Sequence, residues 1–292
     1  MKTQTLPIAI CAIVTTAAIA LSFSTAVADT IKVADLGSHT HIHGLAVDRV
    51  DPNHLFIATH HGLYRAGPDG SAELVSVVQD FMGFNAHPSV PGYLLASGHP
   101  AGGGNLGFIV SKDGGKTWTE VSPGIDGPVD FHQMSVSPAD PETIYGAYGE
   151  LQVSHDGGKS WAIAGQLPER LIDLAASTLR GQMLYAATET GLSVSHDGGV
   201  SWQTLIDEAP VTMVDTAPDG TLYAFVIGRG LVSAKEGVFD FLTVNGEWGD
   251  GFLLHFAVDP TDPDRLYAAS SESEVLESAD GGATWSAFGG GS

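Results

Sequence analysis

The stretch Ser111-Lys-Asp113-Gly-Gly115-Lys-Thr117-Trp118 occurs three more times along the chain with small changes. The other copies are Ser154-His-Asp156-Gly-Gly158-Lys-Ser160-Trp161, Ser195-His-Asp197-Gly-Gly199-Val-Ser201-Trp202 and Ser278-Ala-Asp280-Gly-Gly282-Ala-Thr284-Trp285. All four follow the pattern S-x-D-G-G-x-[ST]-W. A motif that recurs at a fixed period is the signature of a repeat architecture.

The tryptophans of the motif give the period. The successive intervals are 43, 41 and 83 residues, between Trp118, Trp161, Trp202 and Trp285. The last interval is two periods long, so one repeat has lost its tryptophan, and residues 233–241 fit its position. Another degenerate repeat fits residues 70–75, one period before Trp118. Four clear repeats and two degenerate ones make six.

Each repeat contains short runs rich in Val, Ile, Leu, Tyr and Phe, bounded by Gly, Pro and Asp, which predict strands. The runs of the first, third and sixth repeats are 44–47, 55–59 and 62–65; 134–136, 143–146 and 151–154; and 256–258, 265–269 and 275–278. Repeats of ~40 to 45 residues with four strands each are typical of β-propeller blades. We therefore predict an all-β fold, a six-bladed β-propeller forming one domain over residues 29–292. We expect the N-terminal stretch 31–36 to pair with the last blade and close the ring.

The repeated motif resembles the Asp-box, also called the BNR repeat. In such a hairpin the aspartate binds backbone amides of the turn between the third and fourth strands, and the glycines supply positive φ. We therefore expect a structural role for the four aspartates, Asp113, Asp156, Asp197 and Asp280.

The N-terminus predicts export. Lys2 precedes an apolar run from Leu6 to Phe23, and Ala26-Val-Ala28 is a small-x-small cleavage signal. This pattern is typical of a signal peptide, here residues 1–28, that directs a protein to the periplasm or outside the cell. A retained membrane anchor is the alternative. The single cysteine, Cys11, lies in this leader, so the mature chain would offer no thiolate metal site.

The chain is strongly acidic, with a formal net charge of −22. Nucleic acid and anionic membranes are therefore poor partners. We expect a monomer whose partner is a small molecule, a glycan or a protein.

Propeller topology sorts the twelve histidines between two faces. The loops that enter each inner strand and those that join the second and third strands share one face, here called the top face. Eight histidines fall there: His39, His41, His43, His60, His61, His99, His132 and His255. Because His41 and His43 alternate in an extended stretch, their imidazoles point to the same side.

Converging neutral imidazoles can form a divalent metal site. We name His41, His43, His99 and His132 as the leading ligands, with His60, His61 and His255 in support. Histidines without thiolates favour copper(II) or zinc as the cofactor over nickel or iron. The alternative is separate histidines that satisfy turn and channel hydrogen bonds.

Three aspartates are candidate catalytic residues at the same face: Asp80, Asp130 and Asp173. A pair of carboxylates across the channel could perform acid–base work in glycoside hydrolysis. With top-face aromatics, for which we name Phe81, Phe131 and Tyr148, they could form a glycan site. Alternatively, they close turns and solvate the rim.

A set of segments, rather than one motif, resembles a known group. The segments are His41-Ile-His-Gly-Leu45, Ala58-Thr-His60, Met82-Gly-Phe84, Ser97-Gly-His-Pro100, Leu106-Gly-Phe108 and Asp130-Phe-His132. They look like bacterial exported Asp-box proteins commonly labelled glycosyl hydrolase-like or exo-α-sialidase-like. More distantly, the chain resembles sortilin-type and photosystem-assembly-factor propellers, which bind proteins. This resemblance implies glycoside hydrolysis, or protein binding without chemistry.

True sialidase chemistry does not fit the arginines. Sialidases clamp a carboxylate with three arginines, and only Arg170 and Arg229 map to the top face here. Three hypotheses follow: a metal-binding propeller, a glycan-binding or hydrolase-like protein that is not a sialidase, and a scaffold without catalysis.

Overall fold

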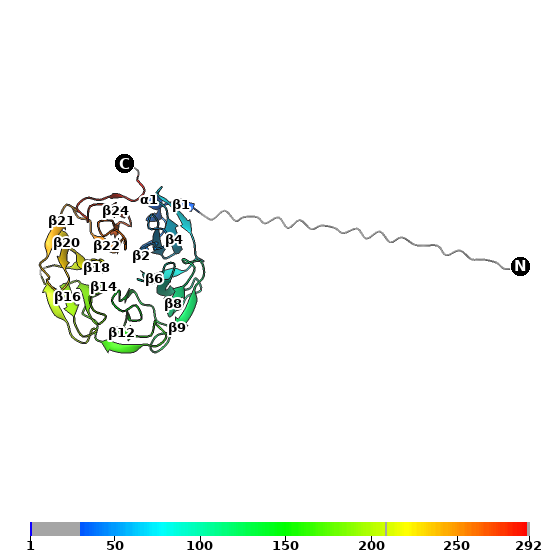
Figure 1. Ribbon diagram of the computed structural model, residues 1–292, viewed down its shortest axis with the longest axis horizontal. Coiled ribbons are helices and arrows are strands. Elements are labelled where there is room, and N and C mark those ends of the chain that lie inside the picture. Colours follow the sequence, from blue (N-terminus) through cyan, green and yellow to red (C-terminus); the bar gives the residue numbers. More distant parts are fainter. Residues whose placement is uncertain (2–29, 208, 291–292) are drawn as a thin grey trace.

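The computed structural model describes Met1, residues 30–207 and residues 209–290. These residues form six antiparallel sheets arranged as blades around a central channel (Figure 1). The six-bladed β-propeller prediction is therefore confirmed. The predicted leader lies outside the described residues, among which no helix is long and apolar enough to cross a membrane.

In blades 2 to 6 the strands run outward from the channel in chain order. Blade 2 has β6 (Asp80–Ala86), β7 (Leu94–His99), β8 (Phe108–Ser111) and β9 (Thr119–Ser122). Blade 3 has β10 (Gln133–Val136), β11 (Ile144–Tyr148), β12 (Glu150–Ser154) and β13 (Ala162–Gly165). Blade 4 has β14 (Leu171–Ala176), β15 (Leu184–Thr188), β16 (Gly191–Ser195) and β17 (Gln203–Ile206). Blade 5 has β18 (Val211–Thr216), β19 (Thr221–Val226), β20 (Gly230–Lys235) and β21 (Leu242–Asn245). Blade 6 has β22 (Leu253–Val258), β23 (Leu266–Ser270), β24 (Val275–Ser278) and β25 (Ser286–Ala287).

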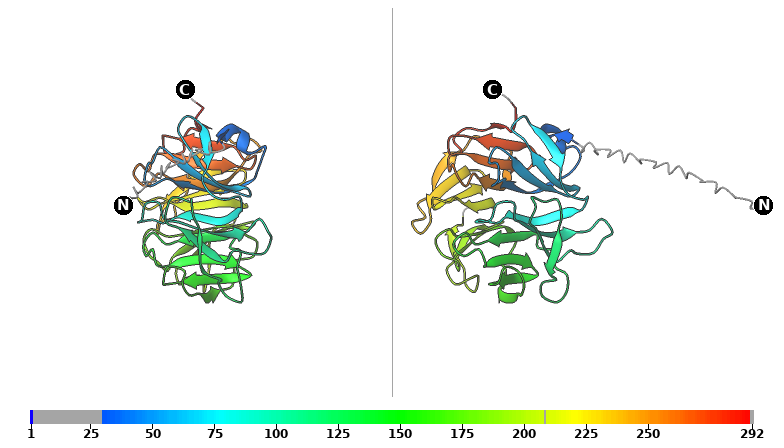
Figure 2. Two further views of the ribbon diagram at one scale, coloured as in Figure 1. Left: turned by 90° about the vertical axis from the view of Figure 1, so that its right-hand side faces the viewer. Right: turned by 45° about the vertical axis from the view of Figure 1, so that its right-hand side comes forward.

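Blade 1 has β2 (Ile42–Val47), β3 (Leu55–Thr59), β4 (Gly62–Ala66) and β5 (Ser71–Leu74), and the N-terminal strand β1 (Thr30–Lys32) is added at its outer edge. Our prediction for residues 31–36 is wrong in its partner: β1 pairs with β5, not with blade 6. The rest of the stretch is one helical turn, α1 (Val33–Leu36), which buries Val33 and Leu36 against both blades 1 and 6. Figure 2 shows α1 on the rim beside the C-terminal blade.

The Asp-boxes form the turns between the third and fourth strands, as predicted. In blade 3, Asp156 accepts bonds from the Ser154 hydroxyl at 2.8 Å and from the Ser160 amide at 2.9 Å. Gly158 has φ +82, and a Cβ there would lie 2.0 Å from the Phe108 ring of blade 2. The second glycine therefore lets each turn pack against the preceding blade.

Polar side chains join neighbouring inner strands around the channel. Asn85 donates to the Met134 carbonyl at 2.7 Å, and the Thr212 hydroxyl donates to the Leu253 carbonyl at 2.7 Å. The His255 Nε2 donates to the Ile42 carbonyl at 3.0 Å and so joins blade 6 to blade 1. These bonds hold the inner strands, and the side chains at their ends, in fixed positions.

Candidate metal centre

His43 occupies an irregularity in the inner strand of blade 1. Ile42 pairs with Thr59 and Gly44 pairs with Ala58, which leaves His43 as the extra residue of a β-bulge. Bulges turn a side chain out of the regular alternation of a strand. The imidazole of His43 lines the mouth of the channel cavity, whose volume is about 430 Å³.

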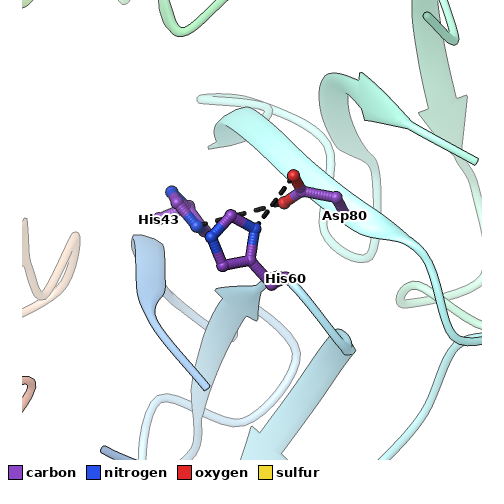
Figure 3. A group of neighbouring side chains, drawn as sticks. All are labelled: His43, His60 and Asp80. Carbon is purple, nitrogen blue, oxygen red and sulfur yellow. Dashed lines mark ion pairs between the residues drawn. The ribbon is translucent and has the colours of Figure 1, made fainter. Parts of the chain in front are cut away.

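Two further side chains approach His43 (Figure 3). His60 directly follows β3, and its ring centre lies 4.1 Å from that of His43. Asp80 opens β6 in blade 2, with Oδ2 3.0 Å from His60 Nδ1 and Oδ1 4.0 Å from His43 Nε2. We call His43, His60 and Asp80 the first group. One ligand atom from each lies within 4.8 Å of the other two.

The first group contains two buried polar atoms that are not satisfied by the protein. Within the described part of the chain, His43 Nε2 and Asp80 Oδ1 have no hydrogen-bond partner, although both are inaccessible to solvent. At 4.0 Å they are too far apart to bond each other. Buried polar groups are normally paired, and a ligand that bridges these two atoms would satisfy both.

The protonation of His43 suits a ligand. Burial and, to a smaller extent, the neighbouring His60 together lower the pKa of His43 to about 4. The imidazole is therefore neutral at pH 7, which is the form that binds metal ions.

A second group of the same composition lies at the edge of blades 2 and 3. It consists of His99 at the end of β7, with Asp130 and His132 just before β10. Asp130 Oδ2 lies 3.1 Å from His99 Nε2 and 2.7 Å from His132 Nε2. The hydrogen bond to Asp130 raises the pKa of His132. Asp130 is 4 % exposed, and its Oδ1 is buried without a partner among the described residues.

The other predicted ligands lie outside both groups. His41 is exposed, with its ring centre 5.7 Å from that of His60. His61 is exposed and lines a separate cavity with His39. His255 lies in the channel wall, where burial lowers its pKa to about 4 and its Nε2 is engaged with Ile42.

The predicted catalytic aspartates separate into two kinds. Asp80 and Asp130 each belong to a histidine group, whereas Asp173 accepts the backbone amides of Leu174 and Val214 in the channel wall. The sequence analysis named the first two aspartates as acid–base residues and did not place them with the histidines. The signal was present in Asp130-Phe-His132, where the carboxylate and imidazole alternate.

The aromatic side chains proposed for a glycan site are mostly unavailable. Phe81 and Phe131 are 0 % exposed and pack against Trp118 and Trp161. Only Tyr148 of the three is exposed. Our expectation for Phe81 and Phe131 was wrong because both rings fill the space between blades.

Comparisons with known proteins agree with the fold. Residues 109–120 match the BNR/Asp-box repeat family. No curated protein shows significant sequence similarity to the chain. A GH74 xyloglucanase from Xanthomonas campestris aligns with a TM-score of 0.59 at 18 % identity, over 89 % of this chain and 46 % of that one. The chain spans less than half the length of the GH74 enzymes it matches.

Two structures of other kinds also align. YCF48 bound to a D1 peptide gives a TM-score of 0.54 at 14 % identity, over 90 % of this chain and 87 % of that one. The extracellular domain of a hybrid two-component system from B. thetaiotaomicron gives 0.59 at 12 % identity, over 87 % of this chain and 35 % of that one. At these identities the similarity concerns the fold alone. The chain is a six-bladed β-propeller that carries the BNR/Asp-box repeat.

Proposed function

We propose that the protein binds a divalent transition metal ion, zinc or copper, at His43, His60 and Asp80. The observation that carries this proposal is the pair of buried, partnerless atoms, His43 Nε2 and Asp80 Oδ1, that face each other at 4.0 Å. A tetrahedral ion with bonds of about 2 Å places its ligand atoms roughly 3.3 Å apart, so a small approach of these two side chains would let one ion satisfy both atoms.

The donor set favours zinc. Two imidazoles and one carboxylate are the protein ligands of zinc sites that keep a fourth position open for water or substrate. The same set also suits iron(II), whereas a carboxylate is a harder ligand than copper prefers. Zinc is therefore the first ion to test and copper the second.

The position of the ligands supports binding with only small side-chain movements. All three side chains project from strand ends in two adjacent blades, whose inner strands are bonded to blade 6 and to blade 3. Sites built on rigid elements keep their geometry better than sites on loops.

We also infer that binding occurs after export, in the periplasm or outside the cell. The predicted signal peptide and the similarity to an extracellular domain support this location. In that setting the protein would handle the metal or present it to a small substrate.

The test measures zinc and copper(II) binding by titration calorimetry, with the metal content of untagged protein from elemental mass spectrometry. We expect His43→Ala/His60→Ala to weaken binding at this group by more than about 100-fold, since even loss of an outer-shell partner costs 10- to 100-fold. The control is His39→Ala/His61→Ala, which removes two exposed top-face histidines outside both groups.

Unchanged binding in the His43/His60 variant would overturn the proposal. A wild-type protein that binds neither ion would move the glycan-binding and scaffold hypotheses ahead.

A further inference from the structure

We propose that His99, Asp130 and His132 bind a second divalent ion, and that the two groups form one two-ion centre across blades 1, 2 and 3. This inference rests on the proposed function for its first ion, but its own ligands are separate.

The tautomer of His99 argues for a cation at the second group. His99 Nδ1 lies 2.9 Å from the Gly104 carbonyl, which can only accept, so Nδ1 carries the proton. In the neutral ring Nε2 then presents its lone pair to Asp130 Oδ2, 3.1 Å away. A lone pair facing a carboxylate oxygen is repulsive, so a cation belongs between these two atoms: a proton in the metal-free protein and a metal ion in the loaded one.

The contact to Gly104 is itself characteristic of a metal ligand. A metal-bound histidine usually donates its other ring N–H to a backbone carbonyl or a carboxylate, which fixes the orientation of the ring. The loop between β7 and β8 supplies this carbonyl from residues next to the site. His99 is therefore oriented before any ligand arrives.

The burial of Asp130 provides a second, independent argument. Its side chain is 6 % exposed, and one oxygen faces two imidazole nitrogens while the other has no partner among the described residues. Burying a carboxylate is costly unless it is paired with positive charge. An ion held by Asp130 and both imidazoles would supply that charge in place of a proton on His132, whose Nε2 lies 2.7 Å from Oδ2.

The two groups are contiguous because they share a strand pair. Asp80 of the first group and His99 of the second are direct partners in the antiparallel β6–β7 register. Direct partners point to the same face of a sheet with Cβ atoms about 5 Å apart.

The number of ligands, rather than their charge, favours two ions over one. Two carboxylates and four neutral imidazoles carry two negative charges, which a single dication would balance, but two separate sets of three ligands exceed the four positions of one tetrahedral zinc ion. With three protein ligands each, two dications would keep open positions at the channel mouth. Those positions would be filled by water or by an incoming oxygen ligand.

The experiment counts ions in four proteins by native mass spectrometry and calorimetry with zinc. We expect two ions in the wild type, one in His43→Ala/His60→Ala, one in His99→Ala/His132→Ala and two in the control His39→Ala/His61→Ala. The His99 and His132 side chains are 40 % and 65 % exposed, so their removal should leave the fold intact. Should the His43 variant fail to fold, His60→Ala alone replaces it, because that side chain is 43 % exposed.

The outcomes separate the two proposals. One ion in the wild type, lost only in the His43/His60 variant, overturns the second site and leaves the first. One ion lost only in the His99/His132 variant overturns the first site and the two-ion centre. One ion that is lost in both variants indicates a single shared site and overturns the two-ion centre. A wild-type protein that binds no ion overturns both proposals.

A second readout tests whether the two ions share a centre. With two copper(II) ions per chain, electron paramagnetic resonance should show dipolar coupling that disappears in either double variant. Two bound but uncoupled copper ions would overturn the shared centre.

Discussion

Burial changes the chemistry of two aspartates in the channel wall. Asp173, on β14, accepts amides from both its own strand and Val214, and Asp215, on β18, accepts the Thr216 amide at 2.8 Å. Burial raises the pKa of each carboxyl to about 7, and for Asp173 the neighbouring charge of Asp215 is a smaller part of the same shift. Asp173 joins blades 4 and 5 through the Val214 amide, and both aspartates lie outside the two histidine groups.

The raised pKa of Asp215 predicts a stability that falls with rising pH. The folded state keeps a proton on Asp215 that the unfolded chain releases near pH 4. The stability that this proton contributes is therefore fully present below pH 4 and is lost as the pH rises through about 7. We expect Asp215→Asn to raise the free energy of unfolding by about 1–2 kcal/mol at pH 8, a value reduced by channel water. At pH 4 the variant should match the wild type.

Urea unfolding at several pH values measures this difference. The control is Asp240→Asn, an exposed position in the same blade. A variant whose stability follows the wild-type pH dependence would show that Asp215 is ionised in the folded protein.

At the scale of the element, blade 5 shows how a degenerate repeat keeps its place in the ring. In blade 5, Leu222 of β19 pairs with Ala234 of β20. In blade 4, the equivalent Leu184 pairs with Ser195, the first residue of the Asp-box, so Ala234 occupies the position of that serine. Glu236 therefore stands where the Asp-box has aspartate. Its longer side chain accepts bonds from Ser177, Thr178 and Tyr185 of blade 4 instead of closing its own turn.

This substitution makes Glu236 a link between blades. The residue is 7 % exposed, and its removal would leave the Thr178 amide and three hydroxyls without their acceptor. We expect Glu236→Ala to lower the free energy of unfolding by about 2–4 kcal/mol, with Glu236→Gln intermediate. Urea unfolding checks this, with Lys235→Ala as the control, since Lys235 is exposed and pairs only with its own blade. Equal losses in the Glu236→Ala and Lys235→Ala variants would contradict the link.

The elements also show which features sequence alone could predict. The Asp-box is local, because Ser, Asp and the glycines of one turn bond one another, so its period predicted six blades. Topology likewise predicted the face of the histidines. Which histidines share a group depends on neighbouring blades: Asp80 meets His43 and His60 only because blade 2 packs against blade 1. The pairing of the N-terminal strand β1 with β5 likewise depends on tertiary contacts that the local sequence does not specify.

For the whole molecule, closure of the ring rests on packing rather than on a shared sheet. Because β1 joins blade 1, blades 1 and 6 meet through side chains, with Leu36 of α1 packed in one cluster with Tyr267 and Phe288 of the last blade. The backbones of Gly70 and Gly289 also come close, since a Cβ on Gly289 would lie 2.2 Å from the Gly70 Cα. Helical turn α1 therefore takes the role that we had assigned to a shared strand.

This closure predicts a local weakness when the helical turn is altered. Leu36 is fully buried, and we expect Leu36→Ala to lower the free energy of unfolding by about 2–4 kcal/mol by leaving a cavity at the junction. Asp35→Ala, on the exposed side of the same turn, should change it by less than about 0.5 kcal/mol. Urea unfolding gives the totals, and native-state amide exchange locates the effect. If α1 closes the ring, exchange in Leu36→Ala should accelerate most in blades 1 and 6 and least in blades 3 and 4. Uniform acceleration across all six blades would mean that Leu36 stabilises the fold without holding the junction.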